Sequence, residues 1–177
     1  KIFWGFETQG VVPDVVTLGK SIGNGYPLSL VATTTEIAEK FDNGMEYFNS
    51  YGGNPVSCAI GHTVLEIIDD EDLQSRSEKV GKKLKSMLNN LQKNHEIIGE
   101  VRGMGLFIGV EFIDRGNKLK PNSTDATSIV NAMKNRGILL SVDGPDKNVI
   151  KIKPPMVFND ENATFLVENL EATLSDY

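Results

Sequence analysis

The sequence predicts an α/β protein in two parts, residues 1–70 and residues 71–177, of which the second forms a small α+β domain. Up to about residue 70, short β-branched runs alternate with stretches rich in Gly, Ser, Thr and Asn. Beyond residue 72, apolar residues recur at helical spacing, and strand-like segments follow. Such a mixture favours antiparallel strands covered by helices in the second part.

In the first part, Val15 to Leu18 follow Pro13-Asp14 and are predicted to form a buried strand that ends at Gly19. A second strand is expected over 28–33, and a short helix capped by Thr34 or Thr35 is expected to run to residue 41. Pro55 follows a Gly-Gly-Asn turn and is placed as the first residue of a helix, where proline is favoured. That helix would carry its apolar residues on one side.

In the second part, a long helix is predicted from about residue 72, because its apolar residues repeat every three or four positions. The first element expected after it is a strand pair or one long bent strand over 99–113. The further elements expected are a flexible loop over 114–124, a helix over 128–136, strands over 138–142 and 149–152, and an amphipathic helix from Asn159 that includes Phe165, Leu166, Leu170 and Leu174.

Composition excludes several classes of protein. The formal charge of −6 and the pI near 5.0 argue against a nucleic-acid scaffold, which would carry a basic excess. Neither a membrane-spanning apolar run nor a signal peptide is expected. Cys58 is the one cysteine and cannot form an internal disulfide, so a cytoplasmic location is expected. His62 and His95 lie far apart in sequence, so we expect no metal site.

Lys20 is the first candidate for chemistry, because it directly follows the strand at 15–18 and precedes a Gly-Asn-Gly loop at 23–25. A lysine at the carboxyl end of a strand stands where ligands bind in open α/β sheets. Partial desolvation would lower its pKa and make it a nucleophile or a base. The ordinary alternative is a solvated surface lysine in a loop.

Two other motifs near Lys20 fail. The string Gly19-Lys20-Ser21 is similar to the end of a phosphate-binding loop, but that pattern needs glycine at position 14, where Asp14 stands. A dinucleotide fingerprint starting at Gly23 would need a third glycine where Leu28 stands.

The surviving segment resembles the Schiff-base signature of class III aminotransferases, a branch of the fold-type I pyridoxal-phosphate enzymes. The residues that fit the signature are Asp14, Val15, Val16, Gly19, Lys20, Asn24 and Gly25. The resemblance implies that Lys20 is the catalytic residue, which forms the Schiff base with pyridoxal 5'-phosphate and then removes a proton from the substrate's Cα. It also implies that residues 1–70 end the large cofactor domain and that residues 71–177 are the small C-terminal domain.

Two further segments resemble landmarks of this family. Residues 47–55 (YFNSYGGNP) are similar to the segment that crosses the dimer interface and offers a hydroxyl to the cofactor phosphate of the other subunit. The resemblance makes Asn49 and Ser50 predicted cofactor-binding residues, with Ser50 where the family more often has threonine. A turn-stabilising serine is the alternative. Residues 101–106 (VRGMGL) resemble the opening of the small domain.

The choice between possible reactions depends on the residue at position 151, which is Lys151. Class III members commonly bind the carboxylate of a keto acid with an arginine just before a Pro-Pro pair, and here Lys151 fills that place before Pro154-Pro155. A lysine offers a point charge in place of a bidentate fork. This departure puts ordinary transamination in doubt. Lys151 and Arg102 are the predicted substrate-binding residues, and solvated or ion-paired cations are the alternative.

The same departure fits the phospho-lyase subgroup, once grouped with alanine–glyoxylate aminotransferase, which acts on ethanolamine phosphate or phosphohydroxylysine. Resemblance to it extends over residues 3–10, 47–58, 102–110 and 150–156. Such an enzyme releases phosphate, ammonia and an aldehyde and needs no keto acid. A transaminase is the second hypothesis, and a fragment without activity of its own is the third.

The resemblance further implies a homodimer with active sites at the interface and a small-molecule amine as substrate. The family's groups that hold the cofactor ring and cradle its phosphate lie upstream of the lysine, and the chain begins at Lys1 without an initiator Met. We therefore expect a part of a longer protein that alone neither holds the cofactor properly nor turns over substrate, and we expect a helix face of the first part to be uncovered.

Overall fold

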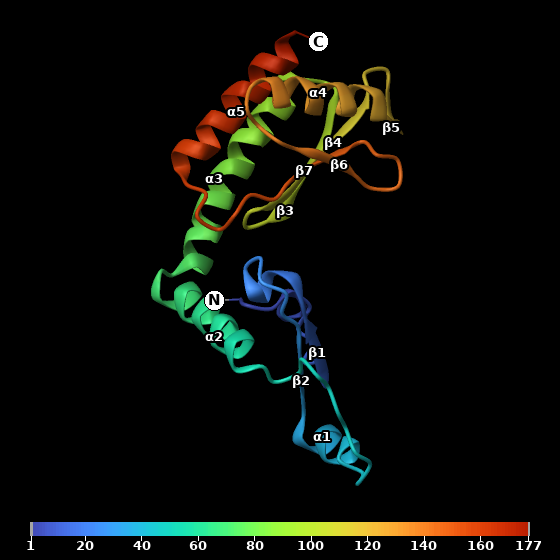
Figure 1. Ribbon diagram of the computed structural model, residues 1–177. Coiled ribbons are helices and arrows are strands. Elements are labelled where there is room, and N and C mark those ends of the chain that lie inside the picture. Colours follow the sequence, from blue (N-terminus) through green and yellow to red (C-terminus); the bar gives the residue numbers. More distant parts are fainter. Residues whose placement is uncertain (1, 177) are drawn as a thin grey trace. The chain divides into compact units, whose positions relative to one another are not determined.

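The computed structural model describes residues 2–176 (Figure 1). They divide into two compact units, Lys1–Gln74 and Ser75–Tyr177, which we call unit 1 and unit 2. The assignment of these regions to a large and a small domain stays a prediction. Within the described residues, the helices are too short or too polar to span a bilayer.

Unit 1 contains two strands, two α-helices and two 3-10 turns. Its elements are η1 (Gly5–Gln9), β1 (Val15–Leu18), η2 (Lys20–Gly23), β2 (Leu30–Thr33), α1 (Thr35–Phe41) and α2 (Pro55–Asp70). The strand at 15–18, the short helix and the helix that begins at Pro55 are confirmed. The strands pair antiparallel, with Val15 opposite Thr33.

Unit 1 has little core of its own. Ile22 and Leu73 are the buried hydrophobic side chains among its described residues. The strand β1 was expected to be buried, but its residues alternate between exposed and half-buried, because no other described element covers it. The apolar side of α2 is likewise open, with Val56 60% and Ile67 45% exposed. The expectation of an uncovered helix face is therefore confirmed.

Unit 2 is a sheet with helices on one face (Figure 1). Its elements are β3 (Ile98–Met104), β4 (Phe107–Asp114), β5 (Asn117–Pro121), α4 (Ser123–Asn135), β6 (Ser141–Asp143), β7 (Val149–Ile152) and α5 (Asp160–Ser175), together with most of α3 (Leu73–Asn94), which begins at the boundary. The strand order is β3-β4-β7-β6, and β5 also pairs with β4. Every described pairing is antiparallel, as expected.

The core of unit 2 follows the alternation of its strands. The sheet side chains that point to the helices are buried, and those of the central strands are Ile108, Val110, Phe112, Ile150 and Ile152. They form one cluster with the buried stripe of α3 and with residues of α4 and α5. The stripe predicted for α3 is confirmed, because Leu84 and Leu88 are fully buried. The opposite face of the sheet carries the polar residues.

Three details of unit 2 differ from expectation. The segment 114–124 was predicted to be a flexible loop, but it forms β5 and the start of α4. Asp114 explains the strand, because its carboxylate accepts from Gly116 N (3.0 Å) and from Lys120 Nζ (2.8 Å) and so closes a hairpin. Asn122 accepts from Asp125 N and caps α4 earlier than the apolar spacing indicated. In α5, Phe165 is 52% exposed and does not belong to the buried side.

Candidate active site

Lys20 lies in a backbone conformation that few residues other than glycine adopt. Gly19 before it is extended (φ −152°, ψ −173°), and Lys20 has φ 51°, in the left-handed region. For a residue with a Cβ, such a conformation costs about 1 kcal/mol or more and persists only where the surroundings enforce it. Three other described non-glycine residues, Asn24, Asp72 and Lys147, share a positive φ, so the backbone conformation by itself does not distinguish Lys20 from them.

The turn that begins at Lys20 packs against α2. The turn η2 begins at Lys20 and buries Ile22, which is 6% exposed. A Cβ on Gly23 would lie 3.1 Å from the Leu28 Cβ, and a Cβ on Gly61 of α2 would lie 2.7 Å from the Leu28 Cδ2. The loop after the lysine therefore packs closely between η2 and α2 within unit 1.

The Lys20 side chain is exposed and makes no hydrogen bond to a described residue. Its amine has no partner within unit 1 that would have to be displaced. A primary amine presented at the end of a strand, on a turn fixed from below, can attack a carbonyl carbon or take up a proton.

Asn49 and Ser50 have different environments. The Asn49 Oδ1 accepts from Tyr51 N (3.2 Å) and Gly52 N (3.0 Å), and its amide donates to the Tyr47 hydroxyl (3.3 Å). Asn49 therefore stabilises the turn that carries Ser50. The Ser50 hydroxyl is exposed and bonds to no described residue, so it remains a donor available to a ligand. No hydrogen bond joins either residue to Lys20 in the described chain.

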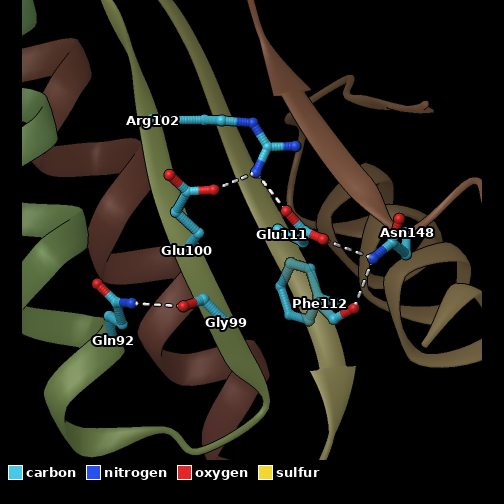
Figure 2. Close-up of polar contacts among 7 residues, drawn as sticks. All are labelled: Gln92, Gly99, Glu100, Arg102, Glu111, Phe112 and Asn148. Atoms are coloured by element: carbon cyan, nitrogen blue, oxygen red, sulfur yellow. Dashed lines mark hydrogen bonds and ion pairs between the residues drawn. The ribbon is translucent and has the colours of Figure 1, made fainter. Parts of the chain in front are cut away.

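Arg102 lies on the polar face of the sheet in unit 2, between two carboxylates (Figure 2). Its Nη1 donates to Glu100 Oε2 at 2.7 Å and also to Glu111 Oε2. The hydrogen bond that Arg102 donates to Glu111, with a smaller contribution from the one to Glu100, raises the pKa of Arg102. Glu111 is fixed in turn by the buried Asn148, whose amide also donates to Phe112 O at 2.9 Å.

Lys151 lies on the same face, two strands away. Its Nζ is 2.5 Å from Asp143 Oδ2, and the Asp143 Oδ1 accepts from Gly144 N at 2.8 Å. The hydrogen bond from Lys151, followed by the one from Gly144, lowers the pKa of Asp143. Lys151 is about one-third exposed, because it stands in β7 between β4 and β6.

The strand register brings the two predicted substrate-binding residues into one row. Arg102 is opposite Gly109, and Gly109 is opposite Lys151. Gly109 itself places no side chain between the two cations, and the Val149 side chain lies beside it, with its Cγ1 3.0 Å from where a Cβ on Gly109 would stand. Lys20, Asn49 and Ser50 belong to unit 1, and the row belongs to unit 2.

Sequence reasoning missed Asp143 and Glu111, the carboxylates that pair with the two cations. The predicted strand pair over 99–113 contains Glu111, but the strand predicted over 138–142 ends before Asp143, which lies on β6 in the structure. Neither prediction carried information about which strand lies beside which. The described residues contain no group of three His, Cys, Asp or Glu side chains suited to a metal ion.

The chain is similar to known proteins over nearly its whole length. A family model described as aminotransferase class-III matches residues 2–174. An "alanine–glyoxylate aminotransferase 2-like" protein of Drosophila melanogaster is 48% identical over 163 residues, which are 91% of this chain and 33% of that protein. An "ethanolamine-phosphate phospho-lyase homolog 1" of Caenorhabditis elegans is 43% identical over 176 residues, which are 98% of this chain and 38% of that protein.

Among solved structures, a phospholyase from Arthrobacter in complex with phosphoethanolamine superposes with a TM-score of 0.94 at 38% identity. The match covers 98% of this chain and 41% of that one. The chain thus spans between 33% and 41% of the length of these proteins.

Proposed function

The chain belongs to the class III aminotransferase family, and from this premise we propose that the whole protein is a pyridoxal-phosphate enzyme that eliminates phosphate from an amino-phosphate such as ethanolamine phosphate. The observation that carries the proposal is Lys20, an exposed amine on a left-handed turn within the family's lysine motif. The similarity to proteins named as phospho-lyases supports the choice of reaction.

Two groups of this chain, the Lys20 amine and the Ser50 hydroxyl, suit the aldehyde and the phosphate of the cofactor. When bound, pyridoxal phosphate supplies an aldehyde for an amine and a ring that withdraws electrons from the substrate's Cα. The exposed amine of Lys20 suits attachment to the aldehyde, and the unbonded hydroxyl of Ser50 suits a phosphate oxygen. Asn49 would act mainly by holding the turn beneath Ser50.

In the proposed reaction, the chain's residues move one proton and bind one anion. Lys20, once its amine is free, removes the proton from the substrate's Cα. The phosphate then leaves from the neighbouring carbon, and hydrolysis gives ammonia and an aldehyde. Lys151 would bind the substrate phosphate. Arg102 is a weaker candidate, because it already pairs with two carboxylates.

The surface of unit 1 supports a homodimer. Tyr47, Phe48 and Tyr51 around Ser50 are 69%, 80% and 87% exposed. Apolar side chains this exposed on one short segment are typical of an interface. A second subunit that covers this segment would place Ser50 beside the cofactor phosphate of that second subunit. We propose further that the enzyme is cytoplasmic and that its substrate is a small-molecule amine.

The test uses the full-length protein that contains this chain. Phosphate release from phosphoethanolamine without any keto acid is expected, and Lys20→Ala is expected to lower the rate at least about 10³-fold. Borohydride reduction should fix the cofactor to Lys20, detected as a mass increase on the peptide that contains it. Phosphate release that persists in Lys20→Ala would overturn the role of the lysine.

A transaminase is the second candidate, favoured by the similarity to a protein named as an aminotransferase. It predicts loss of amine that depends on a keto acid, with no phosphate released. The same assay with and without pyruvate therefore separates the two reactions. The 177-residue chain by itself is expected to show neither activity, because it spans about two-fifths or less of its relatives.

A further inference from the structure

The two cations on the polar face of unit 2 differ in how much negative charge surrounds them. Arg102 contacts both Glu100 and Glu111, so two carboxylates outweigh one guanidinium. Lys151 contacts Asp143 alone, and the pair is neutral. An incoming anion meets a net negative group at Arg102 and a neutral one at Lys151, so the anion subsite of this row is Lys151.

The surroundings of Lys151 make Asp143 its main competitor for an anion. On one side, Gly109 of β4 presents no side chain, and on the other side Asp143 reaches across from β6. Asp143 is 56% exposed and can turn into solvent, and its second oxygen is bound only by Gly144 N. A ligand that binds the Lys151 amine must therefore displace Asp143.

Displacement favours a ligand with two negative charges. Opening the pair costs the same for every ligand, whereas attraction to Lys151 grows in proportion to the ligand's charge. A keto-acid carboxylate has the same single charge as Asp143 and also loses translational freedom on binding. A phosphate monoester with nearly two charges exceeds Asp143 in attraction.

We propose that Asp143 is a specificity-determining residue that, as the counter-ion of Lys151, admits a dianionic phosphate and excludes the carboxylate of a keto acid. The inference rests on the proposed function, because it assigns the substrate phosphate to Lys151. It gives a reason why a protein of this family would eliminate phosphate in place of transferring an amino group. Transfer needs a keto acid as the amino-group acceptor, and Asp143 prevents the carboxylate of that keto acid from binding.

The test is the substitution Asp143→Asn in the full-length holoenzyme. Asparagine keeps an oxygen to accept from Gly144 N, so the turn is retained while the charge is removed. Asp146→Asn, an exposed carboxylate in the same β6–β7 connection, is the matched control. Binding of pyruvate and of inorganic phosphate is measured by calorimetry, with Lys151→Met identifying the heat that belongs to this subsite.

In the unchanged protein, phosphate binds at the Lys151 subsite and pyruvate binds there much more weakly than phosphate. Asp143→Asn is expected to tighten pyruvate binding about five- to tenfold or more, the effect of one unit charge about 4 Å away in a solvated site. The double variant with Lys151→Met should lose this gain, Asp143→Glu should keep pyruvate excluded, and Asp146→Asn should behave as the unchanged protein.

Unaltered pyruvate binding in Asp143→Asn, or an equal gain that survives Lys151→Met, would overturn the inference. A failure of the proposed function is seen separately, as absence of phosphate release from phosphoethanolamine by the unchanged protein. If binding changes as expected and no phosphate is released, the charge filter stands and the reaction assignment fails.

Discussion

Unit 1 and unit 2 come from one chain, yet they bury their apolar residues to very different extents. In unit 2, Leu84, Phe112 and Ile129 are completely buried. In unit 1, Val12 is 93%, Val31 65% and Met45 81% exposed. Both units contain helices and strands, but among the described residues the buried hydrophobic cluster belongs to unit 2. The lysine proposed for chemistry belongs to the unit with the smaller core.

The comparison indicates which contacts support Lys20 and which support Arg102 and Lys151. Lys20 lies on a turn, η2, that packs against α2 and not on a large core. Arg102 and Lys151, by contrast, stand on a sheet whose other face is fully packed. We therefore expect unit 1 to depend on the rest of the protein for its stability, and unit 2 to be stable by itself.

The largest expected effect is a difference in cooperative unfolding between the two units when each is produced separately. Residues 72–177 expressed alone should unfold in one cooperative denaturant transition, because the whole of α3 and the core cluster are retained. Residues 1–72 alone should show no cooperative transition, since Ile22 is their one buried hydrophobic side chain in the described structure. Circular dichroism against urea measures both. A sharp transition in 1–72 would contradict the comparison.

The next effect compares one leucine from a helix of each unit. Leu84→Ala in α3 should lower the free energy of unfolding by about 2–5 kcal/mol, because a fully buried side chain is replaced by a cavity. Leu65→Ala in α2, where the side chain is 42% exposed, should cost about 1 kcal/mol or less. Chemical denaturation of the full-length protein gives both values. Equal losses would show that the rest of the protein buries Leu65 as fully as Leu84.

Alanine substitutions at two helical glycines should change the free energy of unfolding by smaller amounts, and in opposite directions. A Cβ on Gly81 would lie 2.1 Å from the Gly105 carbonyl oxygen, in the backbone of the β3–β4 turn, so Gly81→Ala should destabilise by about 1–3 kcal/mol. A Cβ on Gly61 meets the end of the Leu28 side chain, which can rotate away. Gly61→Ala should then be neutral, or stabilising by up to about 1 kcal/mol through helix propensity. Thermal unfolding of the two variants decides the signs.

The fold was largely predictable where periodicity was long and strong. The stripe of α3 and the alternation of β4 and β7 place the core face correctly, because burial imposes the period of the element. The segment that forms β5 has no such period, since its five residues are all exposed. Its strand depends on the Asp114–Lys120 pair and on the neighbouring edge of β4, which sequence alone does not reveal.

The candidate site residues were proposed one by one from sequence motifs, and these assignments stay predictions. The lysine motif made Lys20 the candidate, although the sequence did not indicate its left-handed backbone. Arg102 and Lys151 were chosen as cations, and their carboxylate partners were missed. Asp143 stands beside Lys151 because β6 and β7 pair antiparallel with Ser141 opposite Lys151, and register of this kind is fixed by tertiary packing.

The smallest expected effect is a loss of stability of unit 2 at acidic pH. The hydrogen bond from Lys120, followed by the one from Gly116 N, lowers the pKa of Asp114 below its ordinary 3.8. Because the folded pKa is lower than the unfolded one, the ionised form stabilises the fold above about pH 3.8, and this stabilisation is lost as pH falls from there through the folded pKa.

Lys120→Met removes the larger of the two causes and should make the loss of stability below pH 3.8 shallower, with little change at pH 7, because exposed pairs contribute little. Denaturation of residues 72–177 at pH 7, 4 and 3 measures the slope, and Lys118→Met, an exposed lysine on the same strand, serves as the control. An identical slope in both variants would mean that the hairpin opens before Asp114 is protonated. Unit 2 would then lose its edge strand first, and its stability would come from the core beneath β4 and β7 alone.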